Sequence, residues 1–139
     1  QHIIYLDNKI YITLVFIIAW GTDTFAYIVG SIAGKHKLCP KLSPNKTVEG
    51  SIGGIMGAIL LTFLLSKYCK LEPLWIFIII SLFGSVIAQC GDLAASKIKR
   101  MVGIKDFGFI MPGHGGILDR FDSILFVAPY IYYIINYFL

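Results

Sequence analysis

The chain has 139 residues, of which 57% are apolar and 14% are charged, and its mean hydropathy is +0.77. An average soluble domain is about 25% charged, so this chain has too few polar residues to cover a water-facing surface. The composition excludes an ordinary cytosolic domain, a disordered tail and a soluble nucleic-acid-binding protein. Lysine and arginine (12) outnumber the acids (8), and in a membrane protein the location of such an excess matters more than its sum.

Four apolar stretches are long enough, or nearly so, to cross a bilayer core of about 30 Å as helices. They are Ile10–Ala33, Val48–Leu65, Leu74–Ala95 and Ile117–Leu139. Polar residues interrupt the first stretch around Asp23 and the last stretch near its start. No stretch shows the alternation of a membrane barrel strand. We therefore predict an all-α, polytopic helical membrane bundle with about four transmembrane helices.

The loops between these stretches differ in charge. The first (34–47) and the third (96–116) each contain four lysines or arginines, whereas the second (66–73) contains two. Two helices separate the first loop from the third, so both lie on the same side of the membrane. The positive-inside rule predicts that these basic loops are cytoplasmic.

The start of the second span carries packing and capping signals. Gly50, Gly53, Gly54 and Gly57 contain two overlapping GxxxG spacings, which favour close packing of helix backbones in lipid over ligand contact. Ser43 or Thr47 is expected to cap the helix, and Glu49 falls in its first turn, where the helix dipole favours an acid.

Candidate chemistry is concentrated between Asp92 and Asp122, which bound four of the eight acids and both arginines. If the third helix continues past the membrane surface, Asp92, Ser96 and Lys99 share one face of it. Acids at the membrane edge are costly and usually face a cavity or a partner. A basic cluster that binds anionic lipid explains the cations of this region but not Asp92.

The acids at the start of the fourth helix point to a metal and a phosphate. Asp119 and Asp122 are three residues apart and share a face, with Arg120 beside them. Carboxylates suit Mg²⁺, and the arginine fork suits phosphate oxygens. The preceding glycines, Gly115 and Gly116 among them, allow backbone N–H groups to approach an anion. These residues favour metal-assisted phosphoryl or nucleotidyl transfer, with an acid-lined ion pathway as the competing interpretation.

The same residues closely resemble the signature of phosphatidate cytidylyltransferases, also called CDP-diacylglycerol synthases. The resemblance is carried by Ser96-Lys97-Ile98-Lys99-Arg100, Lys105-Asp106 and Pro112-Gly113-His114-Gly115-Gly116-Ile117-Leu118-Asp119-Arg120-Phe121-Asp122. An earlier block, which includes Trp20-Gly21-Thr22-Asp23 and Ser43-Pro44-Asn45-Lys46-Thr47-Val48-Glu49-Gly50, also resembles the family. The chain departs from the family at Ala95, Asn45 and Val48, where many members have an acid, a lysine and an aromatic residue.

The resemblance implies transfer of the cytidylyl group from CTP to phosphatidate, which gives CDP-diacylglycerol and pyrophosphate. It implies Mg²⁺, leaving a second cation open, and a homodimer in a bacterial-type cytoplasmic membrane with the active site on the cytoplasmic side. The implied catalytic residues are Asp92, Asp119, Lys99, Arg100 and Arg120. The implied metal ligands are Asp92, Asp119 and Asp122. The implied substrate contacts are Ser96, Lys105, His114, Gly115, Gly116, Ser43 and Lys46.

Family members also have further membrane helices before this region, and Gln1 is not a start methionine. We therefore expect residues 1–139 to be one membrane-embedded catalytic portion, the C-terminal part of a longer polytopic enzyme. The portion alone is then expected to be inactive. The alternatives are the same chemistry on another lipid phosphate, such as an ether or isoprenoid lipid, and an ion transporter.

Overall fold

The computed structural model describes residues 8–104 and 118–138 of the chain. Its elements are α1 (Asn8–Ala33), β1 (Lys37–Cys39), β2 (Ser43–Thr47), α2 (Val48–Tyr68), α3 (Leu74–Met101) and α4 (Leu118–Phe138). Within the described ranges, three helices are long and apolar enough to cross a membrane, namely α1, α2 and α3. The predicted helical membrane bundle is therefore confirmed, with α4 as a fourth helix of 21 residues packed against the others.

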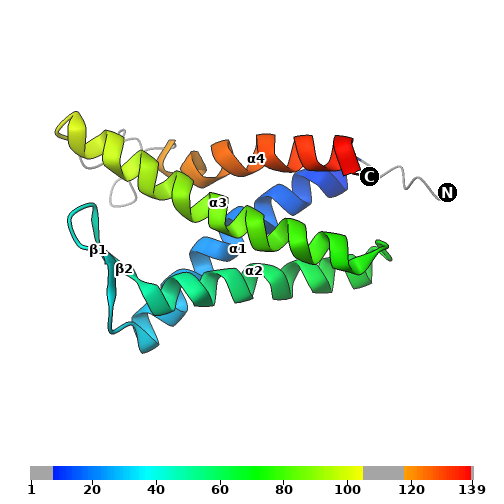
Figure 1. Ribbon diagram of the computed structural model, residues 1–139, viewed down its shortest axis with the longest axis horizontal. Helices are drawn as coiled ribbons and strands as arrows, with labels where there is room; N and C mark the ends of the chain where they lie inside the picture. The colour runs from blue at the N-terminus through cyan, green and yellow to red at the C-terminus, as the bar shows by residue number, and fades with distance from the viewer. Residues whose placement is uncertain (1–7, 105–117, 139) are drawn as a thin grey trace.

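The four helices lie lengthwise beside one another, with α1 crossing obliquely (Figure 1). The end of α1, the start of α2, the end of α3 and the start of α4 all lie at the end that carries β1 and β2, which we call the hairpin end. The connection between α2 and α3 lies at the opposite end. The described part of the third predicted loop, residues 96–104, therefore lies at the same end as the first loop, as predicted.

The first loop differs from its prediction, because part of it forms an antiparallel β-hairpin. Lys37 pairs with Thr47 and Cys39 pairs with Ser43, with an irregularity between the two pairs. Thr47 then caps α2 as predicted, since its side-chain oxygen accepts a hydrogen bond from Gly50 N at 3.1 Å. Ser43, the other candidate cap, lies in β2 and does not cap the helix.

The glycines of α2 allow close contact with α1, as the GxxxG spacing predicted. A Cβ atom on Gly54 would lie 2.7 Å from the carbonyl oxygen of Thr22, and one on Gly50 would lie 2.6 Å from the carbonyl oxygen of Ala26. Both positions leave no room for a side chain. Because lipid provides no hydrophobic force between helices, such close backbone packing is what holds a pair together in a membrane.

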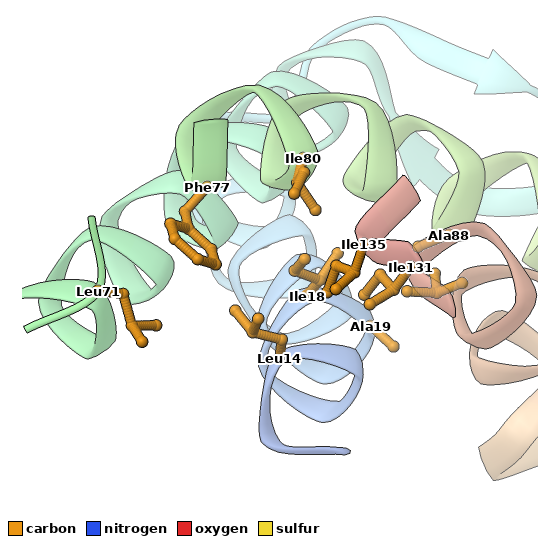
Figure 2. Close-up of a cluster of buried hydrophobic side chains, with 10 residues drawn as sticks. Leu14, Ile18, Ala19, Leu71, Phe77, Ile80, Ala88, Ile131 and Ile135 are labelled. Carbon is orange, nitrogen blue, oxygen red and sulfur yellow. The ribbon is translucent and has the colours of Figure 1, made fainter. Parts of the chain in front are cut away.

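A buried apolar cluster joins α1, α3 and α4 away from the hairpin end (Figure 2). Ile18 of α1, Phe77 of α3 and Ile131 of α4 are its representative members, each almost fully buried. A hydrogen bond between Thr62 and Ser81, 3.0 Å long and also buried, ties α2 to α3. This packing fixes where the helices end, and so positions the polar residues at the hairpin end.

Candidate active site

The hairpin is fastened to α2 by Glu49, the second residue of that helix. Its Oε2 accepts hydrogen bonds from the backbone N–H groups of Lys35 and His36, at 3.1 and 3.2 Å. Its Oε1 lies 2.6 Å from Nδ1 of His36. The backbone N–H of Val48 also donates to the carbonyl oxygen of His36 at 2.9 Å. One carboxylate therefore closes the segment that carries β1 and β2 onto the start of α2.

An ion pair connects the hairpin to α3. Lys46 of β2 donates to the Asp92 carboxylate, and the two side chains are 28% and 23% exposed. A pair that is only partly exposed is less screened by solvent and salt than one on the surface. The cation and the carboxylate are both candidate site residues, and the fold brings them into direct contact from segments far apart in the sequence.

Two more carboxylates lie close to this pair. Asp122 of α4 is in electrostatic contact with Asp92 and with Lys99 of α3. Asp23 of α1 accepts a hydrogen bond from the Ser123 hydroxyl at 3.0 Å and lies in the field of Asp92. The acids of α1, α3 and α4 therefore converge at one end of the bundle, and lysines lie among them.

A cavity of about 250 Å³ opens beside the Lys46–Asp92 pair, and we call it the inner pocket. Its polar wall includes Asp23, Lys46, Asp92, Ser43, Asn45, Thr47, Ser51 and Gln89. Its apolar wall includes Ala26, Tyr27, Leu38 and Leu93. Sites for whole drug-sized ligands have volumes of roughly 300–1,000 Å³, so this cavity suits one part of a substrate. Its mixed wall suits a molecule with a charged head and an apolar body.

A second cavity of about 270 Å³ also borders the hairpin loop, and we call it the outer pocket. It is bounded by Leu42, Ser43, Pro44, Asn45, Ser96, Lys99 and Arg100. Lys99 is almost buried and Arg100 is exposed. Two cations and two hydroxyls around one cavity suit an anion with several oxygens. Ser43 and Asn45 border both pockets, so the pockets are neighbours.

Many of the residues predicted from the sequence are therefore brought together. They are Ser43, Lys46, Asp92, Ser96, Lys99, Arg100 and Asp122. Asp119 and Arg120 lie in the first turn of α4, and their side chains are outside the described part of the structure. Lys105, His114, Gly115 and Gly116 also lie outside the described residues.

Sequence reasoning missed several residues of the site. Asp23 interrupts an apolar span and belongs to a block that resembles the family, but it was assigned no role, and its partner Ser123 lies 100 residues further along the chain. Gln89 and Ser51 carried no signal, although both line the inner pocket and bond to each other. Their shared feature is a polar side chain within an apolar span, one or two turns from a predicted site residue.

The donors present fit a Mg²⁺ ion, although the described residues do not by themselves form a closed metal site. Asp92 and Asp122 lie side by side and offer the one or two carboxylates with which proteins usually bind this ion, the other positions being taken by water and substrate phosphates. In the described ranges, no group of three His, Cys, Asp or Glu side chains has a metal-binding arrangement.

The fold and site define a class: a helical membrane protein with acids, cations and two cavities at one end of the bundle. Residues 4–138 match the profile of the Cytidylyltransferase family, and the chain belongs to that family. The structure is also similar to a solved structure described as an intramembrane enzyme for archaeal membrane lipids biosynthesis, with a TM-score of 0.61 and 20% identity. That similarity covers 86% of this chain and 76% of the other, and it supports the fold.

Curated relatives are similar over most of this chain. The phosphatidate cytidylyltransferase of Staphylococcus epidermidis is 50% identical over 120 residues, which are 86% of this chain and 46% of the relative. The phosphatidate cytidylyltransferase of Bacillus subtilis is 49% identical over 129 residues, which are 92% of this chain and 48% of the relative. The chain therefore spans about half the length of these relatives.

Proposed function

We propose that this chain is the catalytic portion of a phosphatidate cytidylyltransferase, which joins the cytidylyl group of CTP to phosphatidate and releases pyrophosphate. The observation that carries the proposal is the convergence of Lys46, Asp92 and Asp122 from three separate segments, with Lys46 and Asp92 on the wall of the inner pocket. Family membership and the names of the relatives support it. Since those relatives are about twice as long, the activity belongs to a protein that also supplies the rest of their length.

Each pocket suits a different substrate. The inner pocket lies beside membrane-crossing helices and combines an ion pair with apolar side chains, so we assign it to the phosphate and upper part of the lipid. The outer pocket contains Lys99 and Arg100, so we assign it to the phosphates of CTP. Because Ser43 and Asn45 of the hairpin border both pockets, the two substrates would then lie side by side at the membrane edge.

Transfer of the cytidylyl group requires stabilisation of charge on the phosphates more than it requires a strong base. A phosphate monoester is already largely ionised near neutral pH, because its second pKa is about 6. An oxygen of the lipid phosphate attacks the α-phosphorus of CTP, a new P–O bond forms, and the bond to the leaving pyrophosphate breaks. Lys99 and Arg100 neutralise charge on the phosphates, and Lys46 orients Asp92 and meets the lipid phosphate.

Mg²⁺ would be held by Asp92 and Asp122, joined by Asp119 if its predicted role holds. When bound, the ion acts as a Lewis acid that withdraws charge from phosphate oxygens. Whether a second cation takes part stays open, and a homodimer with its active site facing the cytoplasm stays a prediction from the family resemblance.

The test uses a hybrid enzyme, in which this chain replaces the matching segment of the Bacillus subtilis relative. Membranes that contain the hybrid are expected to form labelled CDP-diacylglycerol from labelled CTP and phosphatidate, whereas the chain alone is expected to be inactive. Asp119→Asn should abolish product formation while the protein still inserts into the membrane. Turnover near the unmutated rate in that variant would contradict the proposal.

A further inference from the structure

Gln89 of α3 and Ser51 of α2 form a polar pair on the wall of the inner pocket. The Ser51 hydroxyl donates to Gln89 Oε1, and Gln89 Nε2 donates to the Ser51 carbonyl oxygen at 3.0 Å. A carboxamide has two N–H donors and two acceptor lone pairs. The oxygen and the nitrogen of the carboxamide are therefore each held in place by one bond, and each has capacity for a second bond beside the cavity that Gln89 lines.

The pair lies further from the hairpin end than the Lys46–Asp92 ion pair does. Gln89 precedes Asp92 by three residues, so it shares a face of α3 with Asp92 and lies about 4.5 Å further from the hairpin end. Ser51 likewise follows the capping residue Thr47 by one turn of α2. Both belong to helices that can cross a membrane. Below the Lys46–Asp92 pair, the pocket wall therefore offers the neutral, hydrogen-bonding side chains of Gln89 and Ser51 together with the carboxylate of Asp23.

A second polar pair between α2 and α3, Thr62 and Ser81, differs from the Gln89–Ser51 pair in its position. Thr62 and Ser81 are fully buried, bond to each other at 3.0 Å and line none of the described pockets. That pair is explained by helix packing alone. Gln89 and Ser51 are only partly buried and border a cavity. A purely structural tie does not require that position.

We propose that the Gln89–Ser51 pair is a subsite for the ester carbonyl groups of the acceptor lipid, and that it makes the site prefer ester-linked to ether-linked lipid phosphates. The proposal rests on the function proposed above, which places the lipid phosphate beside Lys46. From there the glycerol backbone carries the ester carbonyls a few bonds deeper, which is a span comparable to the step from Asp92 to Gln89. The free N–H of Gln89 then meets a carbonyl oxygen.

The preference follows from an unmatched donor. An ether lipid has no carbonyl, so the free Nε2–H of Gln89 would face an apolar chain when such a lipid fills the pocket. Sites built to hydrogen-bond a group discriminate against analogues without it, because the polar atoms of the site are left unpaired. One net hydrogen bond corresponds to about a fivefold difference in affinity.

The experiment compares binding of dioleoyl phosphatidate with binding of its diether analogue to the purified chain in detergent micelles, by native mass spectrometry. The chain is expected to bind the diester about fivefold more tightly. Gln89→Leu should bind both lipids equally, at the level of the unmutated chain with the diether. Ser51→Ala, which frees the carboxamide to turn, should lose part of the preference. Cys90→Leu, at the adjacent exposed position, should keep it.

The same lipid pair is compared with the hybrid enzyme, where the readout is the ratio of kcat/KM for the two lipids. Equal affinity of the chain for the two lipids, together with equal kcat/KM of the hybrid enzyme, overturns the inference. A Gln89→Leu variant that binds both lipids more weakly by the same factor also overturns it, because that result is expected of a residue that only holds the helices together. A preference in binding without CTP-dependent product would instead contradict the proposed function and leave the subsite standing.

Discussion

Lys46, next to last in β2, forms an ion pair with Asp92 of α3, although the two residues lie 46 positions apart. This ion pair connects the short hairpin, which lies outside the bundle, with α3, which is one of the four helices of the bundle. Because Asp92 also lies against Asp122, which is in the field of Lys99, Lys46 neutralises one of two carboxylates that would otherwise repel each other. The hairpin is thus part of the site itself as well as a connection between α1 and α2.

Removing the cation should therefore disable the hybrid enzyme. We expect Lys46→Met to lower kcat/KM for phosphatidate by about 100-fold or more, in the range seen when one charge-stabilising donor is lost. The measurement is the rate of CDP-diacylglycerol formation at several lipid concentrations. Lys41→Met is the matched control, because Lys41 is an exposed lysine of the hairpin turn that borders none of the described pockets. Equal losses in both variants would contradict a specific role for Lys46.

Metal removal should act through the carboxylates. Treatment of the hybrid enzyme with EDTA is expected to abolish product formation, and Mg²⁺ should restore it. Asp122→Asn should raise the Mg²⁺ concentration needed for half-maximal rate by about tenfold or more, since loss of one direct carboxylate removes a principal oxygen ligand. Activity that survives EDTA, or an unchanged Mg²⁺ requirement in the variant, would rule out this assignment.

The contacts of Glu49 with the segment that leads into the hairpin give a third prediction. Glu49→Gln removes the charge that holds two backbone N–H groups and the His36 ring, so the hairpin should detach more often from α2. Trypsin cleavage within residues 35–46 is expected to become several-fold faster. His36→Ala removes one of the contacts and should have a smaller effect. An unchanged cleavage rate in Glu49→Gln would show that other contacts hold the hairpin.

The bundle was predictable because its signals are local. A long apolar run identifies a membrane helix, and the number of runs between two loops fixes whether those loops lie on the same side. Thr47 was found as a cap because it precedes the run directly. The hairpin was missed because its strands are three and five residues long and contain Pro44 and Asn45, residues that are depleted in strands. Nothing in such a segment marks it as strand before its partner is known.

The site was predictable where several charges lie close together in the sequence. Lys99 and Arg100 lie in one family motif, and Asp92 precedes that motif by one turn on the same face of the helix. Asp23 has its hydrogen-bond partner on α4, 100 residues away, and Gln89 has its partner on α2, 38 residues away. No periodicity within a helix identifies such pairs, because the packing of α1, α2 and α4 brings them together.

Close packing of α1 on α2 leads to a prediction about stability. Gly54→Ala places a Cβ atom 2.7 Å from the Thr22 carbonyl oxygen. Helix propensity alone would make the change favourable by about 1 kcal/mol, but backbone atoms cannot move aside, and overpacking costs about 1–3 kcal/mol. We expect net destabilisation, measured by unfolding in SDS. Ile52→Ala, on the exposed face of α2, is the control. Greater stability in Gly54→Ala would contradict this contact.

Substitution of Arg100 tests which of the two pockets binds CTP and which binds phosphatidate. Arg100 borders the outer pocket and not the inner one, so Arg100→Ala in the hybrid enzyme should raise KM for CTP and leave KM for phosphatidate nearly unchanged. A hydrogen bond to a charged group is worth about 1.5–3 kcal/mol, which corresponds to roughly a 10- to 100-fold rise in KM. Lys97→Ala is the matched control, because Lys97 is exposed on the same helix and borders neither pocket. A rise in KM for phosphatidate instead would reverse the assignment of the pockets, and a rise for both substrates would mean that Arg100 supports the shared hairpin loop.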